Sequence, residues 1–259
     1  MTIAKVSRAI FDYVSNLLTA PNDLKRLQRD FDRFAATWGG RTAELPLLAD
    51  LPGAVFRRLE ADTPHPIFNP SLVALGDGTF LGTVRCSNFV KFAENTHIRD
   101  AEICDVRNRF FRLTADLDCE FAGELDDGAV RRPGSPAENG IEDCRLFRHR
   151  GEIWGVGTAV AQHGRRLRGR PLLFRLVDGA VRDPRFGPST PGVIEKNWTP
   201  VETDDRLTLL HRLSPPLPVE VHADRLDRVA DAPMPDESWL LRGGTPLVRF
   251  GGHFLAVAH

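Results

Sequence analysis

Hydrophobic residues follow two different spacings, one before about residue 60 and another after Pro66. Residues 5–19 place apolar side chains at three- and four-residue intervals, which predicts an amphipathic helix. Pro21 ends that pattern, and a second apolar stripe runs to about Trp38, where Gly39-Gly40 would stop a helix. We therefore expect residues 1–60 to form an N-terminal helical hairpin.

Beyond Pro66 the helical spacing is replaced by short alternating runs between turn residues, as in β-hairpins. Four segments resemble one another, each with a polar entry, a strand, a tight turn and an apolar return strand. They are residues 69–85, 142–159, 196–212 and 243–259. Their turns fall at Asp77-Gly78, Arg150-Gly151, Asp204-Asp205 and Gly251-Gly252, and pairs such as Asp-Gly tolerate the positive φ that hairpins need.

A hairpin unit that recurs at intervals of tens of residues predicts an all-β fold, a β-propeller over residues 61–259. The alternative is a β-sandwich with similar hairpins, but the repeated polar entry favours the propeller. Only four inner hairpins can be counted and the sequence stops at His259, so the last blade is expected to be missing or truncated. In a propeller the polar entries would meet around one central pocket.

Composition narrows the classes of function. The formal net charge is -1, which gives no electrostatic reason to expect nucleic acid, and no run approaches the ~20 apolar residues of a membrane span. The N-terminus lacks the features of a signal peptide, so a cytoplasmic protein is expected. The four cysteines lack metal-ligand spacing and are expected to be free thiols, and no metal is predicted. The Arg-rich run at 163–170 is interpreted as a solvated loop.

Five short motifs occur in an order that resembles the five-bladed propeller enzymes of the β-mannoside phosphorylase family and bacterial glycosyltransferase-like proteins related to them. The motifs are Asn69-Pro70, Glu142-Asp143-Cys144-Arg145, Lys196-Asn197-Trp198-x-Pro200, His211-Arg212 and Gly243-Gly244-Thr245-Pro246. The resemblance covers about residues 66–259. It implies a carbohydrate-active enzyme that acts on β-mannoside-like glycosides by phosphorolysis, hydrolysis or glycosyl transfer.

The resemblance also implies roles for individual residues. Asp143 would act on the sugar as the catalytic residue, while Arg145, Lys196, His211 and Arg212 would bind phosphate, a co-substrate rather than a cofactor. Convergent cations offset the desolvation of such an anion. His211 could instead be a core histidine, and on a regular strand only one of His211 and Arg212 would reach the pocket.

A second group of residues is expected to shape the sugar site, namely Asn69, Arg85, Asn88, Glu142, Trp198 and Arg242. Trp198 could equally pack in the core, and Lys196 could be an ordinary solvated lysine, although the chain has only four lysines. Arg242 precedes Gly243-Gly244, whose missing side chains would let a ligand or neighbouring backbone approach closely.

One departure from the family concerns the proton donor. Phosphorylases of the family carry an acidic residue about where Asn88 stands, and an amide cannot donate a proton to a leaving group. Either Asp143 or Glu94 does this work, or the reaction differs. Two other interpretations therefore stay open: a non-catalytic protein that binds a glycan or sugar phosphate, and an inactive truncated relative. Oligomers could form through the N-terminal helices.

Overall fold

The computed structural model describes residues 52–53, 63, 65–93, 96–99, 103–163, 166–189, 196–203, 206–213, 216–228 and 243–256. The chain divides into two compact units, one of Met1–Arg58 with Phe89–Asp100 and one of Leu59–Asn88 with Ala101–His259. The helical hairpin expected over residues 1–60 falls almost wholly outside the described residues. In the first unit the structure describes one antiparallel hairpin, β3 (Phe89–Ala93) with β4 (Thr96–Arg99).

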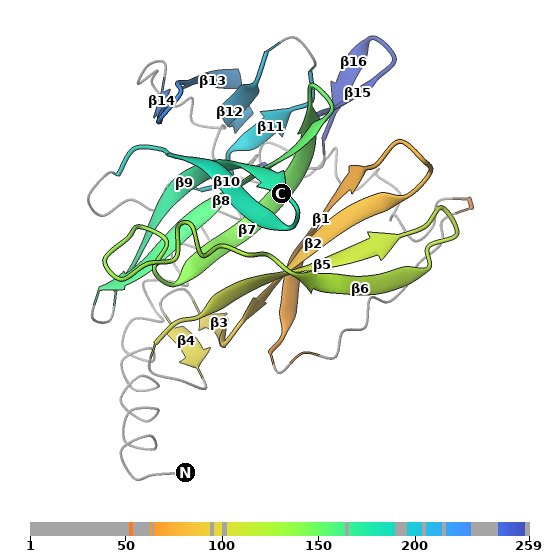
Figure 1. Ribbon diagram of the computed structural model, residues 1–259. Helices are drawn as coiled ribbons and strands as arrows, with labels where there is room; N and C mark the ends of the chain where they lie inside the picture. Colours follow the sequence, from red (N-terminus) through yellow and green to blue (C-terminus); the bar gives the residue numbers. More distant parts are fainter. Residues whose placement is uncertain are drawn as a thin grey trace, which may run out of the picture. The chain divides into compact units, whose positions relative to one another are not determined.

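The second unit confirms the predicted all-β class, with three four-stranded antiparallel sheets and a separate hairpin (Figure 1). The first sheet consists of β1 (Ile67–Ala74), β2 (Phe80–Ser87), β5 (Val106–Leu113) and β6 (Cys119–Glu124). The second consists of β7 (Gly140–His149), β8 (Glu152–His163), β9 (Arg166–Val177) and β10 (Ala180–Phe186). The third consists of β11 (Thr199–Val201), β12 (Thr208–Leu213), β13 (Pro216–Val221) and β14 (Leu226–Arg228). The hairpin is β15 (Val248–Phe250) with β16 (His253–Leu255).

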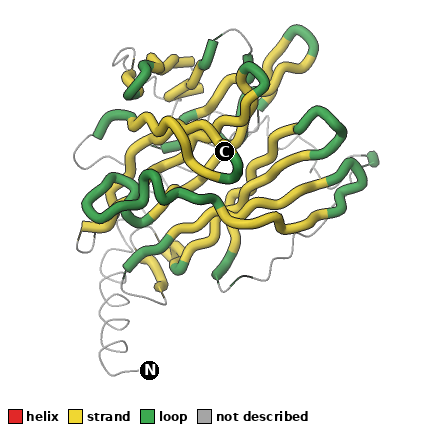
Figure 2. The backbone as a smooth tube through the Cα atoms, viewed as in Figure 1, coloured by secondary structure: helices red, strands yellow, loops and turns green. Residues whose placement is uncertain are grey.

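In each sheet the strands pair in chain order, so each is an antiparallel meander. Figure 2 shows these strands joined by short loops, with no helix in the described part. Accordingly, no helix capable of crossing a membrane is found among those residues.

All four predicted hairpins are present, and the turns are those expected where the structure describes them. His149 pairs with Glu152 across Arg150-Gly151, and both turn residues have positive φ, 52° and 78°, as a two-residue type I′ turn requires. At the first hairpin, both the backbone N–H and the hydroxyl of Thr79 donate to Asp77 Oδ1, at 2.9 and 2.6 Å. The turn at Asp204-Asp205 lies outside the described residues.

Two hydrophobic cores lie on the two faces of the second sheet. Leu146 and Phe174 pack in a cluster with Val73 and Phe110 of the first sheet, while their neighbours Phe147 and Leu173 pack with residues of the third. Successive side chains of a strand point to opposite faces. Because both faces of this sheet are covered, the sequences of its strands contain continuous apolar runs instead of alternating apolar and polar residues. The first, second and third sheets therefore pack in succession.

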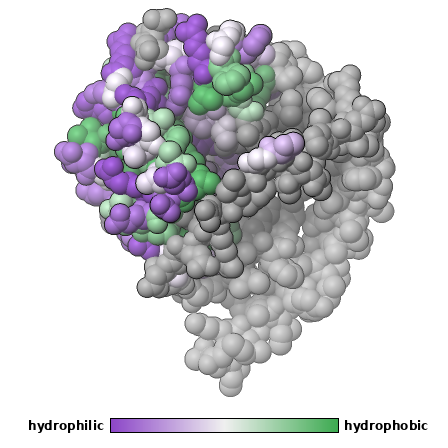
Figure 3. Space-filling model, turned by 90° about the vertical axis from the view of Figure 1, so that its right-hand side faces the viewer, coloured by the Kyte–Doolittle hydropathy of each residue, from purple (hydrophilic) through white to green (hydrophobic). Residues whose placement is uncertain are grey.

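The β15–β16 hairpin differs from the three sheets because its side chains are exposed. Phe250 is 69% exposed, and Val248, Phe254 and Leu255 are exposed as well. Hydrophobic surface is also visible in patches among hydrophilic residues in the view of Figure 3. The backbone of Leu247, just before β15, exchanges hydrogen bonds with Pro200 and Glu202, which ties this hairpin to β11.

Candidate functional site

Three hairpin entries share one unusual backbone conformation. Asn69, Asp143 and Asn197 have φ of 47°, 52° and 64°, in the left-handed region that Asn and Asp tolerate better than most residues. In β1 and β7 this residue lies where the strand register shifts, between Phe68 and Ser71 and between Glu142 and Arg145. Such bulges re-aim side chains and are frequent next to active sites. The repeat predicted from the sequence is thus also a repeat of backbone geometry.

Asp143 is the centre of a polar group that joins two sheets. Its Oδ1 accepts a hydrogen bond from Arg85 Nη1 at 2.8 Å and another from Asn69 Nδ2. Arg85 Nη1 is also 3.7 Å from Glu142 Oε1, and its guanidinium lies over the Phe68 ring, 5.3 Å from the centroid. No described residue donates to Asp143 Oδ2. The structure therefore brings together four of the predicted site residues.

Glu142, next to Asp143, is the second carboxyl group of the site. Its side chain is 13% exposed, and this burial raises its pKa above 4.5. The charges of Arg85 and Lys196 act to lower that pKa, and the charge of Asp143 acts to raise it. The two adjacent carboxyls thus differ: Asp143 is paired with a guanidinium, whereas Glu142 retains its proton to higher pH than an ordinary glutamate.

Arg145 is buried, and three protein oxygens occupy its guanidinium. It donates to the carbonyl of Trp198 at 3.1 Å, to Asn197 Oδ1 at 3.0 Å and to the carbonyl of Gly243 at 2.5 Å. Burial lowers the pKa of this guanidinium. The group predicted to bind phosphate therefore holds the entries of the third sheet and of the last hairpin in place, and phosphate binding by Arg145 stays a prediction.

A small pocket lies beside this guanidinium, with a volume of about 10 Å³, roughly the space of one water molecule. Its walls include Asp143, Arg145, Thr158, Lys196, Asn197 and Trp198. Gly157 also lines it, and a Cβ there would come within 2.7 Å of Ile141 Cγ2 and 2.9 Å of the Glu142 carbonyl. The missing side chain of Gly157 lets β8 pass directly behind the two carboxyl residues.

Lys196 and Trp198 lie at the mouth and wall of the pocket, respectively. Lys196 is exposed and close enough to Glu142 to affect its ionisation. Trp198 is 2% exposed and belongs to the core between the second and third sheets, as the core-packing interpretation expected, although part of its ring lines the pocket.

His211 and Arg212 lie on β12 and do not line this pocket. The His211 ring stands edge-on to Trp198, with centroids 6.0 Å apart, and is half-buried. Arg212 is buried. The register of β12 shifts between Leu210 and Arg212, so the regular alternation assumed for this pair does not hold.

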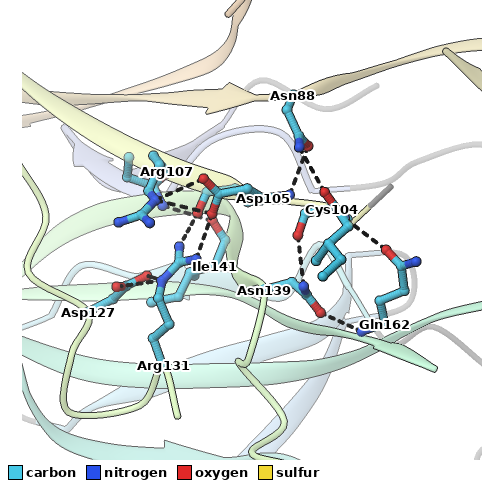
Figure 4. Close-up of polar contacts among 12 residues, drawn as sticks. Asn88, Cys104, Asp105, Arg107, Asp127, Arg131, Asn139, Ile141 and Gln162 are labelled. Carbon is cyan, nitrogen blue, oxygen red and sulfur yellow. Dashed lines mark hydrogen bonds and ion pairs between the residues drawn. The ribbon is translucent and has the colours of Figure 1, made fainter. Parts of the chain in front are cut away.

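Asn88 contacts the loop that precedes β5 (Figure 4). Its Nδ2 donates to the Ile103 carbonyl and its Oδ1 accepts from the Asp105 N–H, both at 2.8 Å. Both ends of the amide are thus used to close the 103–105 loop, beside an ion-pair network in which Arg131 contacts Asp105 and Asp127. This placement identifies Asn88 as a support of that loop.

Arg242 and Glu94 lie outside the described residues. Gly243, which follows Arg242, is closely approached by neighbouring backbone, as the sequence suggested. A Cβ on Gly243 would come within 1.9 Å of Thr199 Oγ1 and 2.8 Å of the Asn197 carbonyl. Neighbouring backbone therefore approaches it closely.

Sequence reasoning assigned no role to Asn197 or Thr158. Asn197 occupies the same place in its hairpin as Asn69 and Asp143, so the internal repeat held a signal for it. Nothing in the sequence marks Thr158. Among the described residues, no cluster of His, Cys, Asp and Glu could hold a metal ion.

Comparison with known proteins gives little beyond this geometry. No protein-family model matches the chain, and no curated protein matches it. Among solved structures, the β-1,2-mannobiose phosphorylase from Listeria innocua in complex with β-1,2-mannobiose matches with a TM-score of 0.45 and 11% sequence identity. That match covers 78% of this chain and 70% of the other.

Proposed function

We propose that the protein is a carbohydrate-active enzyme that cleaves or transfers a glycosyl group at the Asp143 site, with phosphate as a co-substrate. The observation that supports this proposal is the pair of carboxyl groups in different environments. Asp143 is fixed by Arg85 and Asn69, and Glu142 is desolvated and has a raised pKa. Glycoside chemistry uses two carboxyl groups whose environments divide proton donation from charge stabilisation.

The roles follow from the contacts of each residue. Asp143 would accept hydrogen bonds from sugar hydroxyls through Oδ2, because Oδ1 is already occupied by Arg85 and Asn69. Glu142 would hold the proton that the leaving oxygen needs, which removes the need for an acid at position 88. Lys196, the exposed cation at the pocket mouth, would attract the phosphate. Arg145 would position Asn197 and the Lys196 segment rather than contact substrate.

We further propose that the three sheets are consecutive blades of a β-propeller. Each is a four-stranded meander, two open with a left-handed bulge at a polar entry, and the middle sheet is covered on both faces. Packing of successive meanders with their first strands at a shared centre is the propeller arrangement. A small carbohydrate or sugar phosphate would then bind where Asn69, Asp143 and Asn197 converge.

The test is a product assay on a panel of β-mannosides, with and without inorganic phosphate, that detects both sugar 1-phosphate and free reducing sugar. We expect turnover by the wild-type chain and a loss of at least ~10²-fold in kcat/KM for Asp143→Asn and for Glu142→Gln. Asp116→Asn, an exposed aspartate in the turn before β6, is the matched control and should retain full activity. Equal rates in the wild type and Asp143→Asn would contradict the proposal.

A second candidate is a non-catalytic receptor for a glycan or sugar phosphate. It is favoured by Asn88, whose amide is bonded at both ends and supplies no acid. Calorimetry separates the two functions, because saturable binding of a mannoside without any product would identify a receptor. Binding that survives in Glu142→Gln but is lost in Asp143→Ala would fit this function too.

A further inference from the structure

A second pocket lies at the opposite end of β7, where the strand turns into β8. It has a volume of about 320 Å³, is open to solvent, and falls at the lower end of the size range of small-molecule sites. The strand separates it from the first site, because His149 lies six residues beyond Asp143, which is roughly 20 Å of extended chain. Its lining consists of His149, Arg150, Trp154, Arg185, Leu207 and Val221, with Arg206 at the rim.

The charged side chains that line this pocket are arginines, which are hydrogen-bond donors only. Three arginines line it, from the β7–β8 turn, from β10 and from the residue before Leu207, and no carboxyl group does. Three acidic residues near the lining residues in sequence are engaged elsewhere: Glu152 and Asp183 pair with Arg175 at 2.7 and 2.9 Å, and Glu220 lies 3.5 Å from His222. Asp204 and Asp205, which precede Arg206, lie outside the described residues. His149 directs its Nδ1 at the carbonyl of Thr203, 2.9 Å away, so that nitrogen is a donor already in use.

Two donors in the pocket are buried and have no acceptor among the described residues. They are the indole Nε1 of Trp154, a side chain only 6% exposed, and the Nε of Arg185. The Arg185 guanidinium carbon lies 5.2 Å from the centre of the Trp154 ring, so one contact holds both groups. Buried donors are almost always paired in folded proteins, and these two are not.

We propose that this pocket binds the phosphate group of an organic phosphate. A phosphate offers only acceptors, which match the guanidinium groups of Arg150, Arg185 and Arg206 that line the pocket. Leu207 and Val221 form an apolar wall that inorganic phosphate would leave uncovered and that the carbon body of a monoester would cover. This site is independent of the proposed glycosyl chemistry, because it shares no residue with the Asp143 pocket.

The test follows the indole N–H signals of the ¹⁵N-labelled chain during titration with phenyl phosphate, inorganic phosphate or phenol. The signal absent from Trp154→Phe is that of Trp154. We expect phenyl phosphate to shift this signal saturably, inorganic phosphate to shift it with weaker affinity, and phenol to leave it unchanged. Arg185→Gln should weaken phenyl phosphate binding by about tenfold or more, because it removes a charged donor.

Two further variants make the result specific. Arg112→Gln removes the same charge from an exposed position of β5 in the first sheet, and Lys196→Ala removes the cation of the other pocket; both should leave the affinity unchanged. If Arg185→Gln disturbs the fold, visible as movement of the other indole signals, the exposed pair Arg150→Gln with Arg206→Gln replaces it. A Trp154 signal that no phosphate moves, or that phenol moves equally, would overturn the proposal. So would equal weakening by Arg112→Gln or Lys196→Ala.

Discussion

The two ends of β7 carry opposite chemistry on one strand. At the entry end, Glu142 and Asp143 face the guanidinium of Arg85, and Arg145 has its donors bound to three protein oxygens. At the turn end, arginines gather around an indole N–H, and two buried donors have no described acceptor. Buried donors without an acceptor among the described residues occur at both ends, Arg85 Nε and Trp198 Nε1 at the entry end and Trp154 Nε1 and Arg185 Nε at the turn end. The ends differ in their carboxyl groups, because two of these face a guanidinium at the entry end and none lines the pocket at the turn end.

This difference separates two ways of building a site. A paired site costs little to maintain and holds its groups in fixed positions, which chemistry on a bound substrate requires. A site lined by arginines and no carboxyl group reduces the stability of the ligand-free protein and recovers that free energy on binding. Substitutions at the entry end should therefore lower the free energy of unfolding, and substitutions at the turn end should mainly change ligand affinity.

The largest effect is expected from Arg145→Met, which keeps most of the apolar stem and removes the guanidinium. Three buried oxygens from residues 197, 198 and 243 would lose their donor. We expect the free energy of unfolding to fall by about 3 kcal/mol, measured by urea denaturation. Arg206 is exposed at the turn end of β7, and Arg206→Met should change the free energy of unfolding by less than about 0.5 kcal/mol. Equal effects of the two variants would contradict the distinction.

Alanine substitutions at two glycines of β8 test whether stability and ligand binding at the entry end of β7 depend on close packing. A Cβ at Gly155 would come within 2.4 Å of the Phe174 ring, and one at Gly157 within 2.9 Å of the Glu142 carbonyl. Both Gly→Ala variants should lose about 1–3 kcal/mol of stability from overpacking, measured by urea denaturation. Only Gly157→Ala should also change the binding of mannoside or phosphate, because only it displaces the backbone of the carboxyl residues. A ligand affinity altered equally by Gly155→Ala would argue against this local mechanism.

Local sequence signals predicted the hairpins well, because a turn such as Asp77-Gly78 is specified by its own residues. Recognising the polar entries as a repeat led us to expect Asp143, Arg85 and Asn69 close together, but it did not predict the hydrogen bonds that join them. The hydrogen-bond partners of Arg145 could not be predicted, because these acceptors lie 52 to 98 residues away. The sequence alone does not distinguish an arginine that binds phosphate from one that binds backbone carbonyls.

Other parts of the prediction depended on regular strand geometry. The side chains of His211 and Arg212 could not be placed because an unforeseen register shift lies between Leu210 and Arg212. Asn88 was predicted to lie in the sugar site from its spacing after Arg85, and that prediction stays open; its two hydrogen bonds to the 103–105 loop were not predicted. The β3–β4 hairpin, which follows directly, was not predicted either.

A smaller effect is expected on the pH dependence of stability. Burial raises the pKa of Glu142 above 4.5, so the folded state binds this proton more tightly than the unfolded state does. The resulting stabilisation is fully present below pH 4.5 and is lost as the pH rises through the folded-state pKa. Glu142→Gln, which cannot ionise, should therefore lose less stability than the wild type between pH 4.5 and neutrality, measured by urea denaturation across that range.

Glu202→Gln is the matched control for Glu142→Gln, because burial also raises the pKa of Glu202, a residue outside the Asp143 pocket. Both variants should flatten the pH dependence of stability, but only Glu142→Gln should alter the pH profile of glycoside turnover or binding. An unchanged pH profile in Glu142→Gln would remove Glu142 from the proposed proton transfer.

The smallest effect is expected at Cys144, which lies between Asp143 and Arg145 at the entry end. Burial raises the pKa of this thiol to about 12, so almost no reactive thiolate exists at mildly alkaline pH. Cys119 is the exposed thiol among the four, all of which are free. Iodoacetamide should therefore label Cys119 first in the folded protein and all four residues after unfolding, as read by peptide mass spectrometry. Labelling of Cys144 in the folded chain as fast as Cys119 would show that the entry end opens readily, and the contrast between a fixed end and an open end of β7 would then fail.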